Sequence, residues 1–102
     1  MSPQIAFLGA GNMASAIING LITEGFSPAG LKASDPSEVA LSQLRNLGLT
    51  EVSTSPEGIF EGANLVVAAV KPQIIPAALA AISDQLGPDT ALLSIAAGLP
   101  TA

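Results

Sequence analysis

Residues 7–14 read Phe-Leu-Gly-Ala-Gly-Asn-Met-Ala and continue an apolar run that begins at Ile5. Two glycines one residue apart, with Ala14 three positions later, match the pattern G-x-G-x-x-G/A, which joins a strand to a helix. Each small residue has its own steric reason. Gly9 allows the tight turn, Gly11 leaves the main chain open to close approach, and Ala14 lets the helix pack against the strand.

An anion bound at this turn explains the pattern better than a simple connection does. The first N–H groups of a helix have no partner within the helix, and the helix dipole adds partial positive charge there. The diphosphate of a dinucleotide is a ligand that suits such a site. The pattern is weak alone, and the alternative is a glycine turn that only joins two elements. A strand before it and a helix after it favour binding.

Hydrophobic periodicity predicts strands alternating with helices along the whole chain. Apolar residues four apart over 12–24 predict an amphipathic helix that Gly25 ends. The run LVVAAV at 65–70 is typical of a parallel strand buried on both faces. We also expect strands at residues 4–8, 31–34, 51–53 and 91–95, a turn or short helix from Ser55, and a helix from Pro76 to residue 86. This order predicts one domain over residues 1–102, an α/β Rossmann-type doubly wound parallel sheet in three layers, α/β/α.

The stretch Asp35-Pro36-Ser37-Glu38 predicts the start of the second helix. Asp35 is expected as the N-cap, Pro36 at the first helical position and Glu38 at the third. The buried stripe of this helix is expected at Ala40, Leu44 and Leu47, with Gly48 at its end.

Composition excludes several classes of function. Eight acidic and three basic residues give a net charge of −5, which does not supply the basic footprint of a nucleic-acid or anionic-membrane partner. The chain has no cysteine and no histidine, so thiolate or histidine metal sites and serine–histidine triads are excluded. No apolar stretch reaches the roughly 18 residues of a membrane span. No positive charge precedes Lys32, so a signal peptide is not expected. We expect a soluble, cytoplasmic protein whose chemistry comes from a cofactor, from lysine or carboxylates, or from residues elsewhere.

Asp35 has a second predicted role beside that of N-cap. In dinucleotide-binding folds an acid at the end of the second strand, about 20 residues after the glycines, binds the adenosine ribose. Asp35 follows Gly9 at a slightly longer spacing. Its charge suits two free hydroxyls and repels a 2′-phosphate, while Ser34 offers a hydrogen bond. Both roles of Asp35 stay open on the sequence alone.

Two further segments fall at the carboxyl ends of predicted strands, where ligands bind in open parallel sheets. Lys71 follows the fourth strand, and Pro72 restricts it to extended geometry. Ala96 and Ala97 follow the fifth strand, and such small residues leave room for a flat ring. The alternative for both segments is an ordinary surface loop.

Three segments, in this order, carry a family resemblance: FLGAGNMA at 7–14, AVKPQ at 69–73 and SIAAG at 94–98. Together they resemble the N-terminal domain of pyrroline-5-carboxylate reductases, over essentially the whole chain. The resemblance implies a Rossmann domain that binds NADPH or NADH. It implies an enzyme that passes hydride to the C=N carbon of Δ1-pyrroline-5-carboxylate and makes L-proline. It also implies a helical C-terminal domain outside this chain that forms a homo-oligomer and binds substrate, so the fragment alone is expected to be inactive.

The resemblance also implies a role for particular residues. It places the diphosphate at Leu8, Gly9, Ala10, Gly11, Asn12 and Met13, the adenosine ribose at Ser34 and Asp35, and the nicotinamide half at Ala69, Val70, Lys71, Pro72, Ala96 and Ala97. No catalytic residue and no metal ligand is identified. The resemblance implies that family members often prefer NADPH and carry hydroxyl or basic residues at the end of the second strand. Asp35 departs from that pattern, so the choice between NADH and NADPH stays open.

Two alternatives to this function remain. The first is another NAD(P)-dependent reductase that shares the same N-terminal domain. The second is a module that senses nucleotide without catalysis, which the lack of catalytic side chains suggests but which explains neither AVKPQ nor SIAAG.

Overall fold

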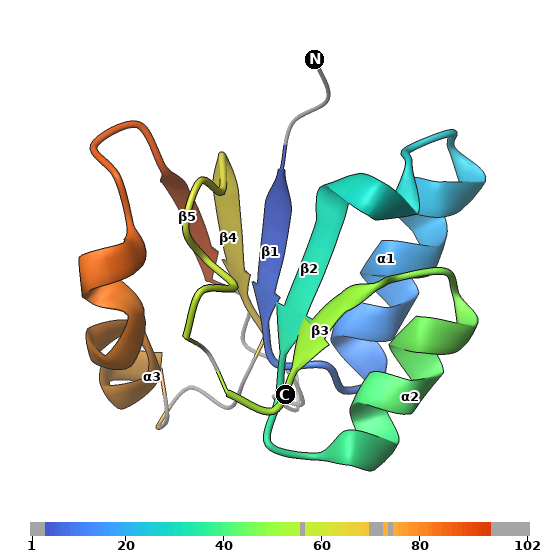
Figure 1. Cartoon of the computed structure of the whole chain (residues 1–102), viewed down its shortest axis with the longest axis horizontal. Helices are drawn as coiled ribbons and strands as arrows, with labels where there is room; N and C mark the ends of the chain where they lie inside the picture. The colour runs from blue at the N-terminus through green and yellow to red at the C-terminus, as the bar shows by residue number, and fades with distance from the viewer. Residues whose placement is uncertain (1–3, 56, 70–72, 74, 95–102) are drawn as a thin grey trace, which may run out of the picture.

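The computed structural model describes residues 4–55, 57–69, 73 and 75–94. Its strands form one sheet in the order β3-β2-β1-β4-β5, and every pairing is parallel (Figure 1). The strands are β1 (Ile5–Leu8), β2 (Leu31–Ser34), β3 (Glu51–Ser53), β4 (Leu65–Ala68) and β5 (Ala91–Ser94). Because all strands run the same way, their carboxyl ends meet at one edge, the lower edge in Figure 1.

Helices cover both faces of the sheet. Helices α1 (Asn12–Thr23) and α2 (Glu38–Asn46) lie on one side, and α3 (Ile75–Ile82) lies on the other (Figure 1). Short 3-10 turns, η1 (Pro28–Gly30) and η3 (Ser83–Gln85), precede β2 and extend α3. The predicted doubly wound sheet in three layers is confirmed. Among the described residues, no helix has the length and apolar character that crossing a membrane requires.

The core consists of two clusters, one on each face, because successive strand residues point to opposite sides of a sheet. Phe7 of β1 and Val67 of β4 pack with Ile18 of α1 beneath α1 and α2. Their strand neighbours Ala6 and Val66 belong to the opposite cluster, which includes Ile82 of α3. Both faces of β1 and β4 are therefore buried, as the continuous apolar run in β4 predicts.

The segment between β3 and β4 fills the α3 side of the core without forming a helix in its described residues. It runs as turns and bends, and it buries Ile59 and Phe60. The main-chain N–H of Phe60 donates to the Gln85 side chain over 3.1 Å, which ties this segment to η3. Of the two forms predicted from Ser55, the turn is the one observed.

The predicted start of α2 is two residues too early, so Pro36 precedes the N-cap and Glu38 is the first helical residue instead of the third. Ser37 is the N-cap, and its hydroxyl accepts from the Ala40 N–H over 3.3 Å. The carboxylate of Asp35 bonds elsewhere, as described below, so it does not cap the helix. The stripe is also shifted: Leu41 and Leu44 are buried, while Ala40 and Leu47 are only partly buried.

The remaining element predictions agree closely with the structure. The first helix is followed by Gly25 and the second by Gly48, both with positive φ, as predicted. The helix predicted from Pro76 to residue 86 begins one residue earlier and ends at Ile82, after which the 3-10 turn η3 continues to Gln85. Strand β4 ends at Ala68 and β5 at Ser94, and Val70 and Ile95, predicted as their last residues, lie outside the described part of the chain.

Candidate functional site

The candidate site lies where the strand order reverses. The chain proceeds from β1 outward through β2 to β3 and then crosses to β4 on the other side of β1. At such a switch point the connections leave β1 and β4 in opposite directions, which opens a crevice at the carboxyl ends of the strands. The glycine loop that follows Leu8 and the start of α1 occupy this place.

Gly9 makes the tight turn at the end of β1. Its φ is 104°, a conformation that costs an L side chain about 1–2 kcal/mol. Its N–H donates to the Ser34 carbonyl over 2.8 Å, so the turn continues the pairing of β1 with β2 for one more residue. The predicted steric reason for glycine at this position is confirmed.

Gly11 has no such conformational reason. Its φ of −76° and ψ of −164° are open to any residue, and a Cβ built on it meets nothing within 4 Å. The fold therefore tolerates a side chain here, and the space that the missing side chain leaves is free. This is the arrangement that close approach of a ligand to the main chain requires.

The start of α1 adjoins this free space. The N–H of Ser15 donates to the Gly11 carbonyl over 2.9 Å, so Gly11 is the N-cap. The N–H groups of Asn12, Met13 and Ala14 precede this bond and have no partner within the helix. The first turn carries no acidic residue, so nothing there opposes an anion. Ala14 is fully buried, which allows the close packing of α1 on the sheet that its small size predicts.

Asp35 connects three parts of the site. Its Oδ2 accepts from the Ala10 N–H in the glycine loop, and its Oδ1 accepts from the Ser37 N–H before α2, each over 2.8 Å. Its own N–H donates to the Ser53 carbonyl at the end of β3 over 3.2 Å. The carboxylate therefore lies beside the glycine loop, at the place where an acid can meet the ribose.

The nicotinamide half of the predicted site is only partly described. Ala69 follows β4, and its N–H donates to the Leu8 carbonyl over 2.8 Å, so the ends of β1 and β4 are held together. The other predicted residues of this half, Val70, Lys71, Pro72, Ala96 and Ala97, lie outside the described residues.

The described residues of the predicted site offer mostly main chain. The side chains of Leu8, Ala10, Ser34 and Ala69 are buried in the fold. Met13 is exposed, and Asp35 is partly exposed. The bond from Ala10 to Asp35 was not expected from the sequence.

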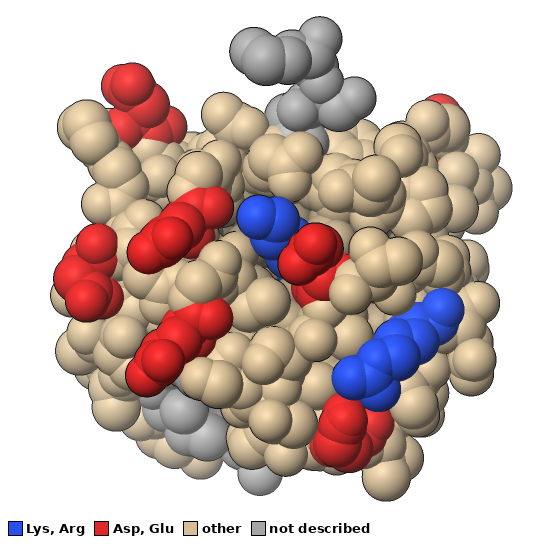
Figure 2. All heavy atoms as spheres, in the orientation of Figure 1, with Lys and Arg blue, Asp and Glu red and all other residues tan. Residues whose placement is uncertain are grey.

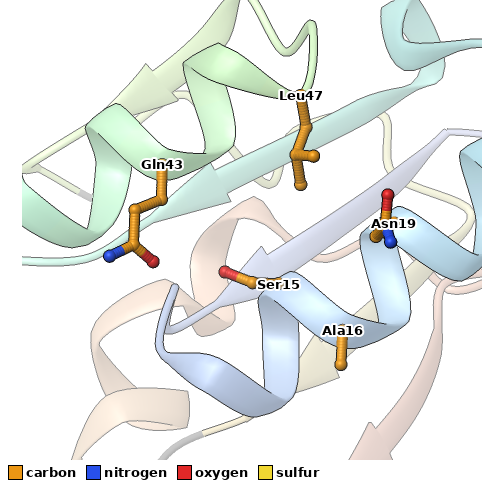
Figure 3. A pocket seen from close by; sticks show the side chains of 5 residues that line it. All are labelled: Ser15, Ala16, Asn19, Gln43 and Leu47. Atoms are coloured by element: carbon orange, nitrogen blue, oxygen red, sulfur yellow. The ribbon is translucent and has the colours of Figure 1, made fainter.

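A groove between α1 and α2 lies outside the glycine loop. Ser15, Ala16 and Asn19 line it from α1, and Gln43 and Leu47 line it from α2 (Figure 3). The Ser15 hydroxyl points into the groove on the side of α2, and its oxygen is buried without a hydrogen-bond partner (Figure 3). None of the described residues that line the groove is charged.

Among the residues that the structure describes, Asp35 is the charged side chain at the glycine loop. On the face that Figure 2 shows, acidic side chains predominate and the basic ones lie beside acidic ones. Arg45 of α2 is paired with Glu38 over 3.1 Å. Within the described ranges, no three histidine, cysteine, aspartate or glutamate side chains gather as a metal site would need.

Comparison with known proteins gives a consistent result. Residues 4–98 match the family described as NADP oxidoreductase coenzyme F420-dependent. Pyrroline-5-carboxylate reductase of Pseudomonas aeruginosa is 39% identical over 101 residues, 99% of this chain and 37% of the relative. Its counterpart in Methanosarcina acetivorans is 36% identical over 99 residues, 95% of this chain and 36% of the relative. The chain thus spans little more than a third of the length of these relatives.

Solved structures show the same likeness. A pyrroline-5-carboxylate reductase from Coxiella burnetii has a TM-score of 0.86 at 28% identity, over 93% of this chain and 36% of that one. The Plasmodium falciparum pyrroline carboxylate reductase, solved with NADP bound, has a TM-score of 0.74 at 28% identity, over 91% of this chain and 33% of that one. On the family match, which covers nearly the whole chain, this protein belongs to the NADP oxidoreductase coenzyme F420-dependent family.

Proposed function

We propose that this chain is the cofactor-binding part of a pyrroline-5-carboxylate reductase, and that it binds NADH or NADPH at the glycine loop. The observation that carries the proposal is the free space at Gly11, directly before α1, in a position where the fold itself does not need glycine. The similarity to named pyrroline-5-carboxylate reductases over nearly the whole chain supports the substrate class.

The residues present fit a dinucleotide. The N–H groups of Gly9 and Ala10 already bond within the fold, so the main chain from Gly11 to Met13, at the N-terminus of α1, would hold the diphosphate. Asp35 lies beside that loop and would meet the adenosine ribose. The ends of β1 and β4, joined through Leu8 and Ala69, would place the nicotinamide half over the crevice. A bound nicotinamide cofactor supplies the hydride that reduces the C=N bond of the substrate.

The chain itself needs to supply little chemistry for this reaction. A protonated imine is already electrophilic, and the work of the protein is to bring the donor and acceptor carbons together. A site made largely of main chain, without histidine or tyrosine, is compatible with that work. Substrate-binding residues, assembly into a homo-oligomer and location in the cytoplasm are parts of the proposal that depend on the rest of the protein.

The test has two stages. Backbone amide signals of the 102-residue chain are followed by NMR during titration with NADH and NADPH, and we expect those of residues 9–13 to shift most. The complete protein is then assayed with pyrroline-5-carboxylate, and we expect oxidation of the cofactor and formation of proline. Unmoved loop signals would remove the binding site, and binding without turnover in the complete protein would indicate the nucleotide-sensing alternative.

A further inference from the structure

We propose that Asp35 makes this chain prefer NADH over NADPH and also positions the glycine loop. The inference rests on the proposed function, because it concerns the adenosine end of the same cofactor. It goes beyond that function by specifying which of the two cofactors the site accepts.

The carboxylate of Asp35 is fixed and still has capacity to bind. A carboxylate offers about four acceptor positions. Two of these are used by the N–H groups of Ala10 and Ser37, one on each oxygen. The remaining lone pairs can accept from two ribose hydroxyls, while the two existing bonds hold the carboxylate in one orientation beside the loop.

A 2′-phosphate would meet charge of its own sign here. A phosphate monoester carries about −1.5 to −2 charges at neutral pH. Asp35, directly after β2, carries the charge of the same sign, whereas Glu38 in the first turn of α2 is balanced by its ion pair with Arg45. An ionised carboxylate only accepts hydrogen bonds, so it cannot donate to the phosphate oxygens. The two groups would therefore repel each other and form no hydrogen bond.

The described basic side chains do not offset this charge. Lys32 lies in the middle of β2, in register with Ala6 of the α3-side core cluster, so its side chain is directed to that face of the sheet. Arg45 lies in the last turn of α2 and pairs with Glu38. Neither lies beside the Asp35 carboxylate at the carboxyl edge of β2.

The experiment measures dissociation constants of the 102-residue chain for NADH and NADPH. The chain has no tryptophan and no tyrosine, so the emission of the reduced nicotinamide reports binding without interference from indole or phenol. We expect NADH to bind at least tenfold more tightly than NADPH. In Asp35→Asn and Asp35→Ser we expect that preference to fall at least fivefold, mainly through tighter binding of NADPH.

Glu24→Gln is the matched control, because it removes one negative charge at the opposite end of α1 from the glycine loop. We expect its preference to stay within twofold of the wild type. If Asp35 only holds the loop, both Asp35 variants will lose affinity for the two cofactors equally, and the unchanged ratio will overturn the inference.

The wild-type titration separates this inference from the proposed function. Equal affinities, or tighter binding of NADPH, would overturn the NADH preference and leave the proposed function standing. Binding of neither cofactor would overturn both. A ratio that shifts equally in Glu24→Gln would show that net charge, and not the position of Asp35, sets the preference.

Discussion

Replacing Gly11 with alanine should weaken cofactor binding while leaving the fold intact. The backbone at Gly11 already has φ −76° and ψ −164°, and a Cβ there meets no atom within 4 Å. The added methyl group therefore causes no strain in the folded chain. It occupies the space through which a diphosphate would reach the main chain and the first N–H groups of α1.

The expected change in folding stability is close to zero because two effects of similar size oppose each other. Alanine is the poorer N-cap, which costs about 0.5–1 kcal/mol. It also lowers the entropy of the unfolded chain, which contributes about 0.4–1 kcal/mol of stability. Binding of NADH should weaken at least tenfold, which is about 1.4 kcal/mol.

Gly9→Ala is the contrasting variant. Its φ of 104° makes alanine cost about 1–2 kcal/mol in the folded state. At roughly 4–8 °C per kcal/mol for a domain of this size, the melting temperature should fall by about 4–16 °C. Thermal melts followed by circular dichroism and a titration with NADH give both quantities. If Gly11→Ala binds NADH as tightly as the wild type, the reasoning about the free space at Gly11 is refuted.

Three other substitutions test the packing around the site. Ser37→Ala removes the observed N-cap of α2 and should cost about 1 kcal/mol in a urea titration; an unchanged midpoint would contradict that assignment. Ser15→Ala removes a buried hydroxyl without a partner and introduces a better helix former, so stability should rise by about 0.5–1 kcal/mol, and a loss would mean that the hydroxyl is bonded. Phe60→Ala empties the α3 side of the core and should cost about 3–5 kcal/mol; a cost below 1 kcal/mol would show that the turn segment is not part of that core.

The glycine loop shows how far local sequence can predict a site. The roles of Gly9 and Ala14 were predicted correctly because each depends on steric constraints within a few residues. Gly9 is needed for the tight turn after β1, and Ala14 for the close packing of α1 on the sheet. Gly11 was predicted to leave main chain open, and the structure adds that no demand of the fold accounts for it. That distinction needs the surrounding atoms, which the motif does not contain.

Asp35 shows where local prediction failed. The sequence Asp-Pro-Ser-Glu is consistent with a cap at either the first or the third residue, since both side chains can accept from a helix N–H. The hydrogen bond from the Ala10 N–H to the Asp35 carboxylate decides between the two caps. Ala10 is adjacent to Asp35 in space but 25 positions away in the chain. A pattern of four consecutive residues contains no information about a hydrogen-bond partner at that separation.

The sequence by itself determined the order of strands and helices, the turn at Gly9 and the C-terminal ends of α1 and α2, because these follow from backbone sterics and from apolar spacing within one element. Tertiary structure decided the strand order β3-β2-β1-β4-β5, the burial of Phe60 from a segment whose described residues form turns and bends, and the bond from Ala10 to Asp35. These three features depend on which distant segments of the chain become neighbours. The neighbours are set by the burial of both faces of β1 and β4 at once, and not by the secondary-structure propensity of any single segment.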